Sequence, residues 1–185
     1  LLYEYLSSFL KEEELLTFFS DETIQIEAYA ESLEMSANRV YALYSMISAN
    51  KPKILITHTS AYLRFLPQIE TFKKNIKKLV VGEEYDRDEL VKYLIEVGYK
   101  PVNKVSTTLE FSKRGEVVDI YSVNYDNPIR IEFFDNEIAK IFNSKNSNYE
   151  MTMMTGADIL ATAGFIYQNN RFYSNIFAVY QKLVY

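Results

Sequence analysis

The chain has 185 residues, of which 48% are hydrophobic and 24% charged, with a formal net charge of −5, so it is long enough for one domain or two small ones and is neither disordered nor fibrous. It has no cysteine and one histidine, His58, which excludes disulfides, thiolate nucleophiles, cysteine-bound metals and multi-histidine metal sites, and we expect no cofactor. No apolar run approaches the ~18 residues of a membrane span and none is typical of a signal peptide, so we expect a cytoplasmic protein without a membrane partner.

The N-terminal part of the chain is predicted to alternate helices with strands. Leu1–Phe19 has apolar residues at helical spacing, interrupted by an acidic run, and Thr23–Ala28 alternates like a short strand. A helix capped at Ser36 should follow. Ile54–Thr57 is predicted to be a fully buried strand, of the kind found in parallel sheets. This alternation indicates an open α/β layer.

The pattern changes in the middle of the chain. Asp86 begins a capping box, which predicts a helix over residues 87–97 that ends at Gly98. Residues 99–142 then alternate apolar and polar side chains with a period of two, with Asp135-Asn136 as a hairpin turn between two strands. We therefore expect a helix followed by a small, twisted antiparallel sheet.

The C-terminal part continues neither pattern cleanly. Asn143–Asn148 is predicted to be a polar linker. Met151–Tyr185 is rich in tyrosine, phenylalanine and isoleucine, and we interpret it as an edge element added to the first domain.

Little in the sequence favours catalysis. The five glycines form neither the phosphate loop Gly-x-x-x-x-Gly-Lys-Ser/Thr nor Gly-x-Gly-x-x-Gly. His58 follows a predicted strand, with Thr59 and Ser60 beside it, where sites of α/β proteins gather, but there is no Gly-x-Ser-x-Gly elbow. We favour a partly buried histidine bonded to backbone over a nucleotide-binding or hydrolytic site.

Charge is distributed unevenly along the chain. Residues 1–50 carry two basic and nine acidic side chains, whereas residues 51–81 carry seven basic and one acidic. The basic cluster Lys73–Lys78 permits a phosphate-binding interpretation. We favour a solvated helix end or edge with Ile76 and Leu79 facing the core.

Basic side chains also gather in the predicted sheet, at Lys100, Lys104, Lys113, Arg114 and Arg130. Arg130 and Glu132 share one strand face because they are two residues apart. They can pair with each other, or they can present a patch of mixed sign to another protein. The pattern leaves both alternatives open.

Two stretches resemble a known family. Within Lys78–Tyr121 stands the motif Phe-x-x-Arg-Gly-x-x-x-Asp-Ile-Tyr, and within Pro128–Ile138 stands Arg-x-Glu-x-Phe-Asp-x-Glu-Ile. Both resemble the UvrB-homology region of the transcription-repair coupling factors (the Mfd family). Lys53–Pro67 looks like the first-domain segment of the same family, so the resemblance covers about residues 15–143.

The resemblance implies an α/β fold: a degenerate helicase-like (RecA-like) parallel-sheet domain with an inserted small α+β antiparallel-sheet domain. Residues 1–80 would be the first part of UvrB-like domain 1, and residues 81–143 the inserted UvrA-binding domain 2. Residues 144–185 would be the linker and the return segment of domain 1. Such a module has lost its phosphate loop and is not itself an enzyme.

The resemblance also implies the partners. UvrA would be recruited to stalled RNA polymerase in nucleotide excision repair, and the full-length protein would also bind RNA polymerase and double-stranded DNA as a translocating ATPase. The UvrA-facing residues would be Arg114, Glu132, Arg130, Lys100 and Phe111, with Lys100 replacing a basic residue that relatives carry shortly after the tyrosine matching Tyr99. The alternative is a DNA-handling fragment of a UvrB-type excision-repair ATPase, with DNA contacting Lys73–Lys78.

Overall fold

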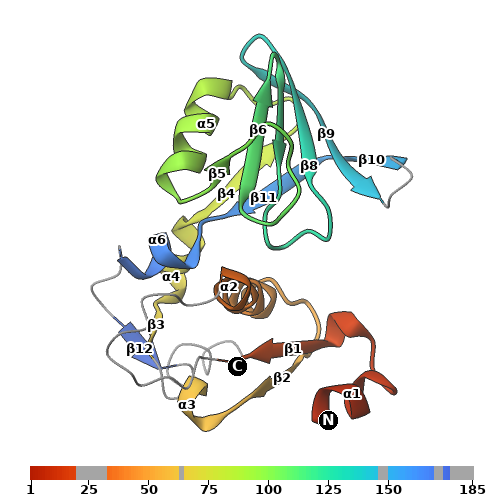
Figure 1. Cartoon of the computed structure of the whole chain (residues 1–185), viewed down its shortest axis with the longest axis vertical. Coiled ribbons are helices and arrows are strands. Elements are labelled where there is room, and N and C mark those ends of the chain that lie inside the picture. The colour runs from red at the N-terminus through yellow and green to blue at the C-terminus, as the bar shows by residue number, and fades with distance from the viewer. Residues whose placement is uncertain (20–32, 63–64, 146–149, 169–172, 176–185) are drawn as a thin grey trace. The chain divides into compact units, whose positions relative to one another are not determined.

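The computed structural model divides the chain into two compact units (Figure 1). Unit 1 comprises residues 1–73 and the described residues after 166, and unit 2 comprises residues 74–166. The residues that the structure describes are 1–19, 33–62, 65–145, 150–168 and 173–175. Together they form a mixed α/β fold with small antiparallel sheets.

Unit 1 packs a long helix on two short parallel strands. β1 (Leu15–Phe18) and β2 (Ile54–Thr57) run parallel, and α2 (Leu33–Ile47) contacts β1. Leu15, Leu16 and Phe18 of β1 are buried, as are Val40 and Leu43 of α2. The remaining elements are α1 (Leu2–Ser7), the 3-10 helix η1 (Glu12–Glu14), α3 (Thr59–Tyr62), β3 (Phe65–Pro67), α4 (Ile69–Lys74) and β12 (Tyr173–Asn175), which is antiparallel to β3.

Three predictions for unit 1 were wrong in detail. Leu15–Phe18 forms a strand and not a helix, because pairing with β2 satisfies its backbone while burying its apolar side chains. The long helix begins at Leu33, so Ser36 lies within it and is not its cap. Ile54 is 43% exposed, so β2 is not fully buried. The strand predicted at Thr23–Ala28 lies outside the described residues.

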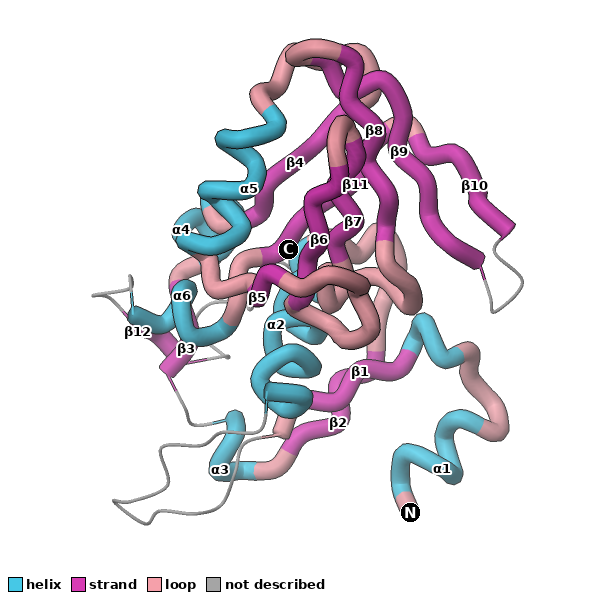
Figure 2. The backbone as a smooth tube through the Cα atoms, turned by 45° about the horizontal axis from the view of Figure 1, so that its top comes forward, coloured by secondary structure: helices cyan, strands magenta, loops and turns pink. Residues whose placement is uncertain are grey.

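Unit 2 contains a six-stranded sheet in the order β10-β9-β8-β7-β6-β5 (Figure 2). Neighbouring strands are antiparallel except for β5 and β6, which are parallel. A separate antiparallel pair joins β4 to β11. The elements are β4 (Ile76–Val80), α5 (Arg87–Glu96), β5 (Lys100–Pro101), β6 (Glu110–Arg114), β7 (Val117–Ile120), β8 (Ile129–Phe134), β9 (Glu137–Lys145), β10 (Glu150–Met154), β11 (Gly156–Leu160) and α6 (Ala163–Gln168).

The helix of unit 2 follows its sequence signals. The carboxylate of Asp86 accepts hydrogen bonds from the backbone N–H of Asp88 (2.6 Å) and of Glu89 (3.0 Å), which satisfies two unpaired donors of the first turn. Gly98 has φ +96°, the left-handed conformation that ends many helices. Leu90 is fully buried on the core side, and the predicted helix is confirmed.

The strands after α5 follow the predicted period of two, but one of them extends into the predicted linker. Asp135, at φ +53°, forms with Asn136 the turn between β8 and β9, as predicted. Asn143–Lys145, predicted to be linker, instead continues β9. There Asn143 lies opposite Thr152 and Ser144 opposite Met151 of β10, because cross-strand pairing satisfies the backbone despite the polar composition.

A buried hydrogen-bond network fixes β11. The Tyr99 hydroxyl donates to the Leu160 carbonyl (2.8 Å), and the Leu160 N–H donates to Ser122 Oγ (3.1 Å). The Asp158 N–H donates to the Tyr125 hydroxyl (2.9 Å). Burial raises the pKa of Tyr99, because a phenolate there would lose its hydration. The loop after β7 and the start of β5 are thereby joined to a strand far along the chain.

Tyr99→Phe is expected to lower the free energy of unfolding by about 1–3 kcal/mol, because the buried Leu160 carbonyl loses its donor. Urea denaturation measures this change. Tyr121→Phe is the matched control: it removes a hydroxyl that donates to the Asp126 carbonyl at an exposed position, so we expect a loss below about 1 kcal/mol. Equal losses in the two variants would contradict the importance of the buried network.

Candidate partner-binding surface

The register of the β6–β9 ladder gives the sheet of unit 2 two different faces. Residues directly opposite one another project to the same face, and neighbours along a strand alternate. On the core face, Val118 of β7 lies opposite Ile131 of β8, which lies opposite Ile141 of β9, and all three are fully buried. The outer face carries two rows of side chains, which are Ser112–Asp119–Arg130–Phe142 and Arg114–Val117–Glu132–Lys140.

Asp119 on the outer face lies between two arginines. Arg130 Nε donates to Asp119 Oδ1 (2.7 Å) and Arg130 Nη2 to Asp119 Oδ2 (3.0 Å). Arg114 Nη2 lies 3.6 Å from the same Oδ2. The hydrogen bonds that Arg130 donates to Asp119 raise the pKa of Arg130. This paired geometry fixes the planar guanidinium of Arg130 and leaves the cluster with a net positive charge.

Exposure separates the roles of the two arginines. The Asp119 side chain is only 13% exposed and that of Arg130 37%, whereas that of Arg114 is 61% exposed. Arg130 is therefore held in the sheet surface, while most of the Arg114 side chain is exposed to solvent. Glu132 and Lys140 lie opposite each other in the same row as Arg114, so the face presents charges of both signs.

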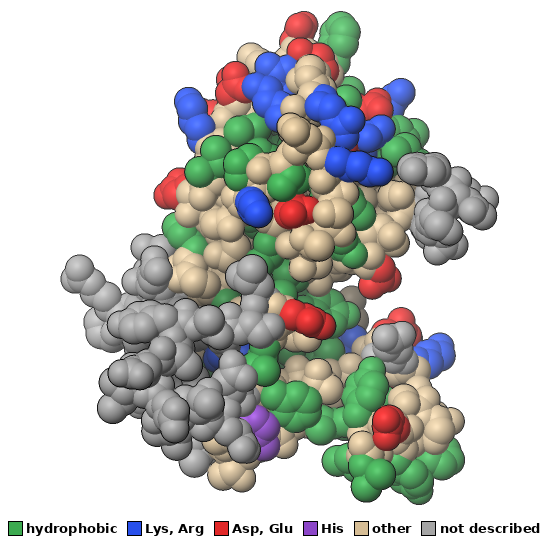
Figure 3. Space-filling view, viewed as in Figure 1, with side chains coloured by type: hydrophobic (Ala, Val, Ile, Leu, Met, Phe, Trp, Pro, Cys, Tyr) green, Lys and Arg blue, Asp and Glu red, His purple; other side chains and the backbone are tan. Residues whose placement is uncertain are grey.

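Apolar side chains border this charged centre. Phe134, at the end of β8, is 73% exposed. Met153 of β10 is 66% exposed and lies opposite Phe142, on the outer face. Figure 3 shows basic and acidic side chains intermingled over the ends of β6–β9, with hydrophobic side chains beside them. Arginine, methionine and aromatic side chains, which this face exposes together, are enriched in protein-binding surfaces.

The structure brings together three of the five predicted site residues: Arg114, Arg130 and Glu132 share the outer face. Arg130 pairs with Asp119 at hydrogen-bonding distance, which the sequence analysis did not anticipate. Lys100 is exposed on the edge strand β5, in register with Glu110 and outside both charged rows.

Phe111 was predicted to lie on the UvrA-facing surface, but the structure places it in the core. It is only 2% exposed and lies on the core face, in register with Ile120 of β7, which is fully buried. The alternation of β6 places Phe111 and Arg114 on opposite faces, because they are three residues apart. Phe111 therefore belongs to the core face of the sheet.

Sequence reasoning missed Asp119 and Lys140. Asp119 alternates with the buried Val118 and Ile120, which was a signal for the outer face. Its pairing with Arg130 depends on the register across the loop between β7 and β8. That loop is too long for a standard hairpin turn to predict the register.

In the basic cluster Lys73–Lys78, three lysines are exposed and Lys77 is half-buried. Leu79 is buried, as predicted, whereas Ile76 is only half-buried. Lys77 Nζ lies 4.5 Å from the ring centroid of Tyr85 and 5.6 Å from that of Tyr93. Burial raises the pKa of Tyr93 to about 12, so its ring is neutral where the ammonium approaches it.

His58 is bonded to backbone, as favoured. Its Nδ1 accepts from the Ala61 N–H (3.2 Å) and lies 2.6 Å from Ser60 Oγ. The imidazole stacks on the Phe19 ring, with centroids 5.5 Å apart. These contacts give His58 a structural role at the start of α3.

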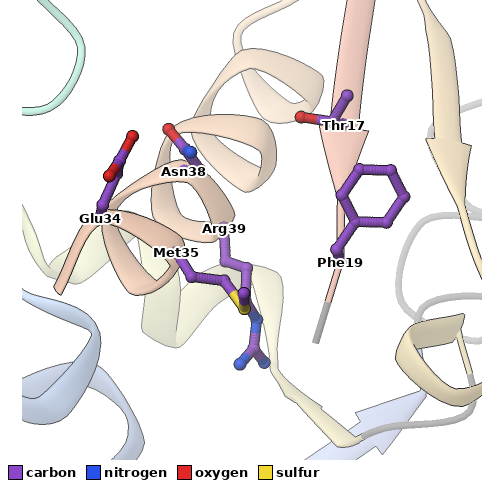
Figure 4. A pocket seen from close by; sticks show the side chains of 6 residues that line it. All are labelled: Thr17, Phe19, Glu34, Met35, Asn38 and Arg39. Carbon is purple, nitrogen blue, oxygen red and sulfur yellow. The ribbon is translucent and has the colours of Figure 1, made fainter. Parts of the chain in front are cut away.

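A pocket of about 250 Å³ lies elsewhere in unit 1, between β1 and α2. In Figure 4, Arg39 and Met35 extend from α2, and across from them lie Thr17 of β1 and Phe19, the residue after this strand. The Arg39 guanidinium lies 5.3 Å from the ring centroid of Phe18, so it takes part in packing. The described lining holds no glycine and offers no cradle of backbone amides for phosphate.

Two kinds of feature are absent from the described residues. None of the helices there combines the length and the apolar character that a membrane crossing requires. In the same residues, no three histidine, aspartate or glutamate side chains group closely enough to hold a metal ion.

The chain is similar to known proteins in two respects. Residues 77–165 match the family model of the UvrB interaction domain. A transcription-repair-coupling factor of Bacillus subtilis (strain 168) is 36% identical over 141 residues, which are 75% of this chain and 12% of that protein. One of Staphylococcus aureus (strain bovine RF122 / ET3-1) is 29% identical over 164 residues, which are 85% and 14%. The chain thus spans 12–14% of the length of these two relatives.

Phe111→Ala is expected to lower the free energy of unfolding by about 3–5 kcal/mol, because it leaves a cavity in the core face of the sheet. Chemical denaturation measures the loss. Lys100→Ala, on the neighbouring strand but exposed, should change stability by less than about 0.5 kcal/mol. A Phe111→Ala variant as stable as the wild type would contradict the core position of this ring.

Proposed function

The chain corresponds to part of the transcription-repair-coupling factors and includes a UvrB interaction domain, and on this premise we propose that it recruits UvrA in nucleotide excision repair coupled to transcription. The role is binding, without catalysis by this chain. The proposed contact surface is the outer face of unit 2, with Arg114, Arg130 and Glu132 at its centre.

The cluster of Asp119 with its two arginines is the observation that carries this proposal. A guanidinium held by a paired carboxylate is ordered before the partner arrives, so binding orders fewer groups. Arg114 keeps most of its donors exposed and suits a partner carboxylate, which a guanidinium binds through two parallel hydrogen bonds. The mixed signs of the face favour one partner orientation over others.

The proposal also assigns a role to each part of the chain. Residues 81–143, which lie within unit 2, would be the UvrA-binding domain, and the residues of unit 1 would belong to a degenerate helicase-like, RecA-like domain. The parallel pairing of β1 with β2, covered by α2, supports such a domain in unit 1. Binding of RNA polymerase and double-stranded DNA, and ATP hydrolysis, would belong to the longer protein.

Arg114→Glu is expected to weaken UvrA binding at least tenfold, or about 1.4 kcal/mol, because it reverses the most exposed charge of the cluster. Titration of purified UvrA against the wild-type and variant chains measures the affinity. Lys92→Glu is the matched control, since it makes the same charge change at an exposed position of α5. Thermal melting of each variant verifies the fold.

Two outcomes would contradict the proposal. An Arg114→Glu variant that melts like the wild type and binds UvrA equally well removes this face as the docking site. Binding of duplex DNA without binding of UvrA, weakening steeply with salt, would instead support the DNA-handling role of a UvrB-type protein.

A further inference from the structure

The turn between β6 and β7 is tied to the first turn of α5. Arg87 Nη1 donates to the Gly115 carbonyl (2.9 Å) and lies 2.6 Å from Glu116 Oε1. Gly115 adopts φ +57°, a conformation in which glycine is favoured. The Arg87 side chain is 23% exposed, so a largely covered guanidinium bridges the backbone and a side chain of this turn.

A second contact with the first turn of α5 is made by Lys113, the residue before Arg114. Lys113 Nζ pairs with Asp88 Oδ1, and this contact lowers the pKa of Asp88. Asp88 is itself held, because its N–H donates to the capping carboxylate of Asp86. The first turn of α5 is therefore an ordered anchor for the end of β6.

Arg114 lies between the tied residues and faces the other way. Lys113 and Glu116 contact the first turn of α5, while Arg114 lies across the sheet with Asp119 at 3.6 Å. That distance is longer than a hydrogen bond, so Asp119 alone fixes the Arg114 side chain only loosely. The backbone on both sides of Arg114 then sets the position of its Cα atom and the direction in which its side chain leaves the strand.

We propose that Arg87 is a positioning residue for the partner-binding surface, which holds the β6–β7 turn so that Arg114 is presented in one orientation. This inference rests on the proposed UvrA-binding function. Arg87 need not touch the partner. It acts by reducing the conformational freedom that binding would otherwise have to remove.

The choice of arginine fits this role. Nη1 contacts both the Gly115 carbonyl and the Glu116 carboxylate, and the rigid guanidinium plane holds that nitrogen in one geometry, whereas a lysine ammonium at the end of a flexible stem holds it less firmly. Arg87→Lys should therefore recover part of the effect of Arg87, and Arg87→Ala none of it.

The first test is amide hydrogen exchange of the full 185-residue chain. In Arg87→Ala, exchange over residues 113–117 should accelerate about fivefold or more, with the core strand β8 unchanged. Lys92→Ala, an exposed position on the same helix, should leave the turn unchanged. Unchanged exchange over 113–117 in Arg87→Ala overturns the proposal, whatever UvrA does.

The second test is a double-mutant cycle with purified UvrA. Arg87→Ala should weaken binding about fivefold when Arg114 is present and have no further effect in an Arg114→Ala background. Equal weakening in both backgrounds would mean a general structural effect and would overturn positioning. If Arg114→Ala alone leaves the affinity unchanged, the docking face itself has failed, while the exchange measurement still decides whether Arg87 holds the turn.

Discussion

The cross-strand register of β6–β9 is the constraint on which the rest of unit 2 depends. A slip of one residue would move Arg114 and Arg130 into the core and turn Val118 and Ile131 to solvent. The fully buried apolar row forbids that slip. The charged face is therefore a consequence of the core face, and neither can be altered in register without the other.

The outer face of this sheet combines a structural ion pair with an exposed arginine. Asp119 is nearly buried, so its charge needs compensation, and Arg130 provides this through two hydrogen bonds. Arg114 shares the same carboxylate but remains exposed. One arginine mainly completes the sheet surface, and the other is largely exposed to solvent.

Elements that are encoded by neighbouring residues were easier to predict from the sequence than elements that depend on pairing with a distant strand. α5 was predictable because its Asp86 cap is encoded within a few residues. Leu15–Phe18 and Asn143–Lys145 were not, because partner strands distant in sequence determine their structure. In the candidate site, the motifs predicted Arg114, Arg130 and Glu132, which the structure places on one face of the sheet. The alternation that buries Phe111 and the pairing of Asp119 with Arg130 required the three-dimensional register.

The pairing of β4 with β11 has a consequence for modularity. Ile76 lies opposite Leu160 and Val80 opposite Gly156, so the chain enters and leaves unit 2 through adjacent, antiparallel strands. A unit whose two ends emerge side by side can be spliced into a surface loop of an unrelated scaffold, since the host needs to bridge only a short gap. The pairing of β4 with β11 is thus expected to allow unit 2 to be inserted into another protein together with its charged face.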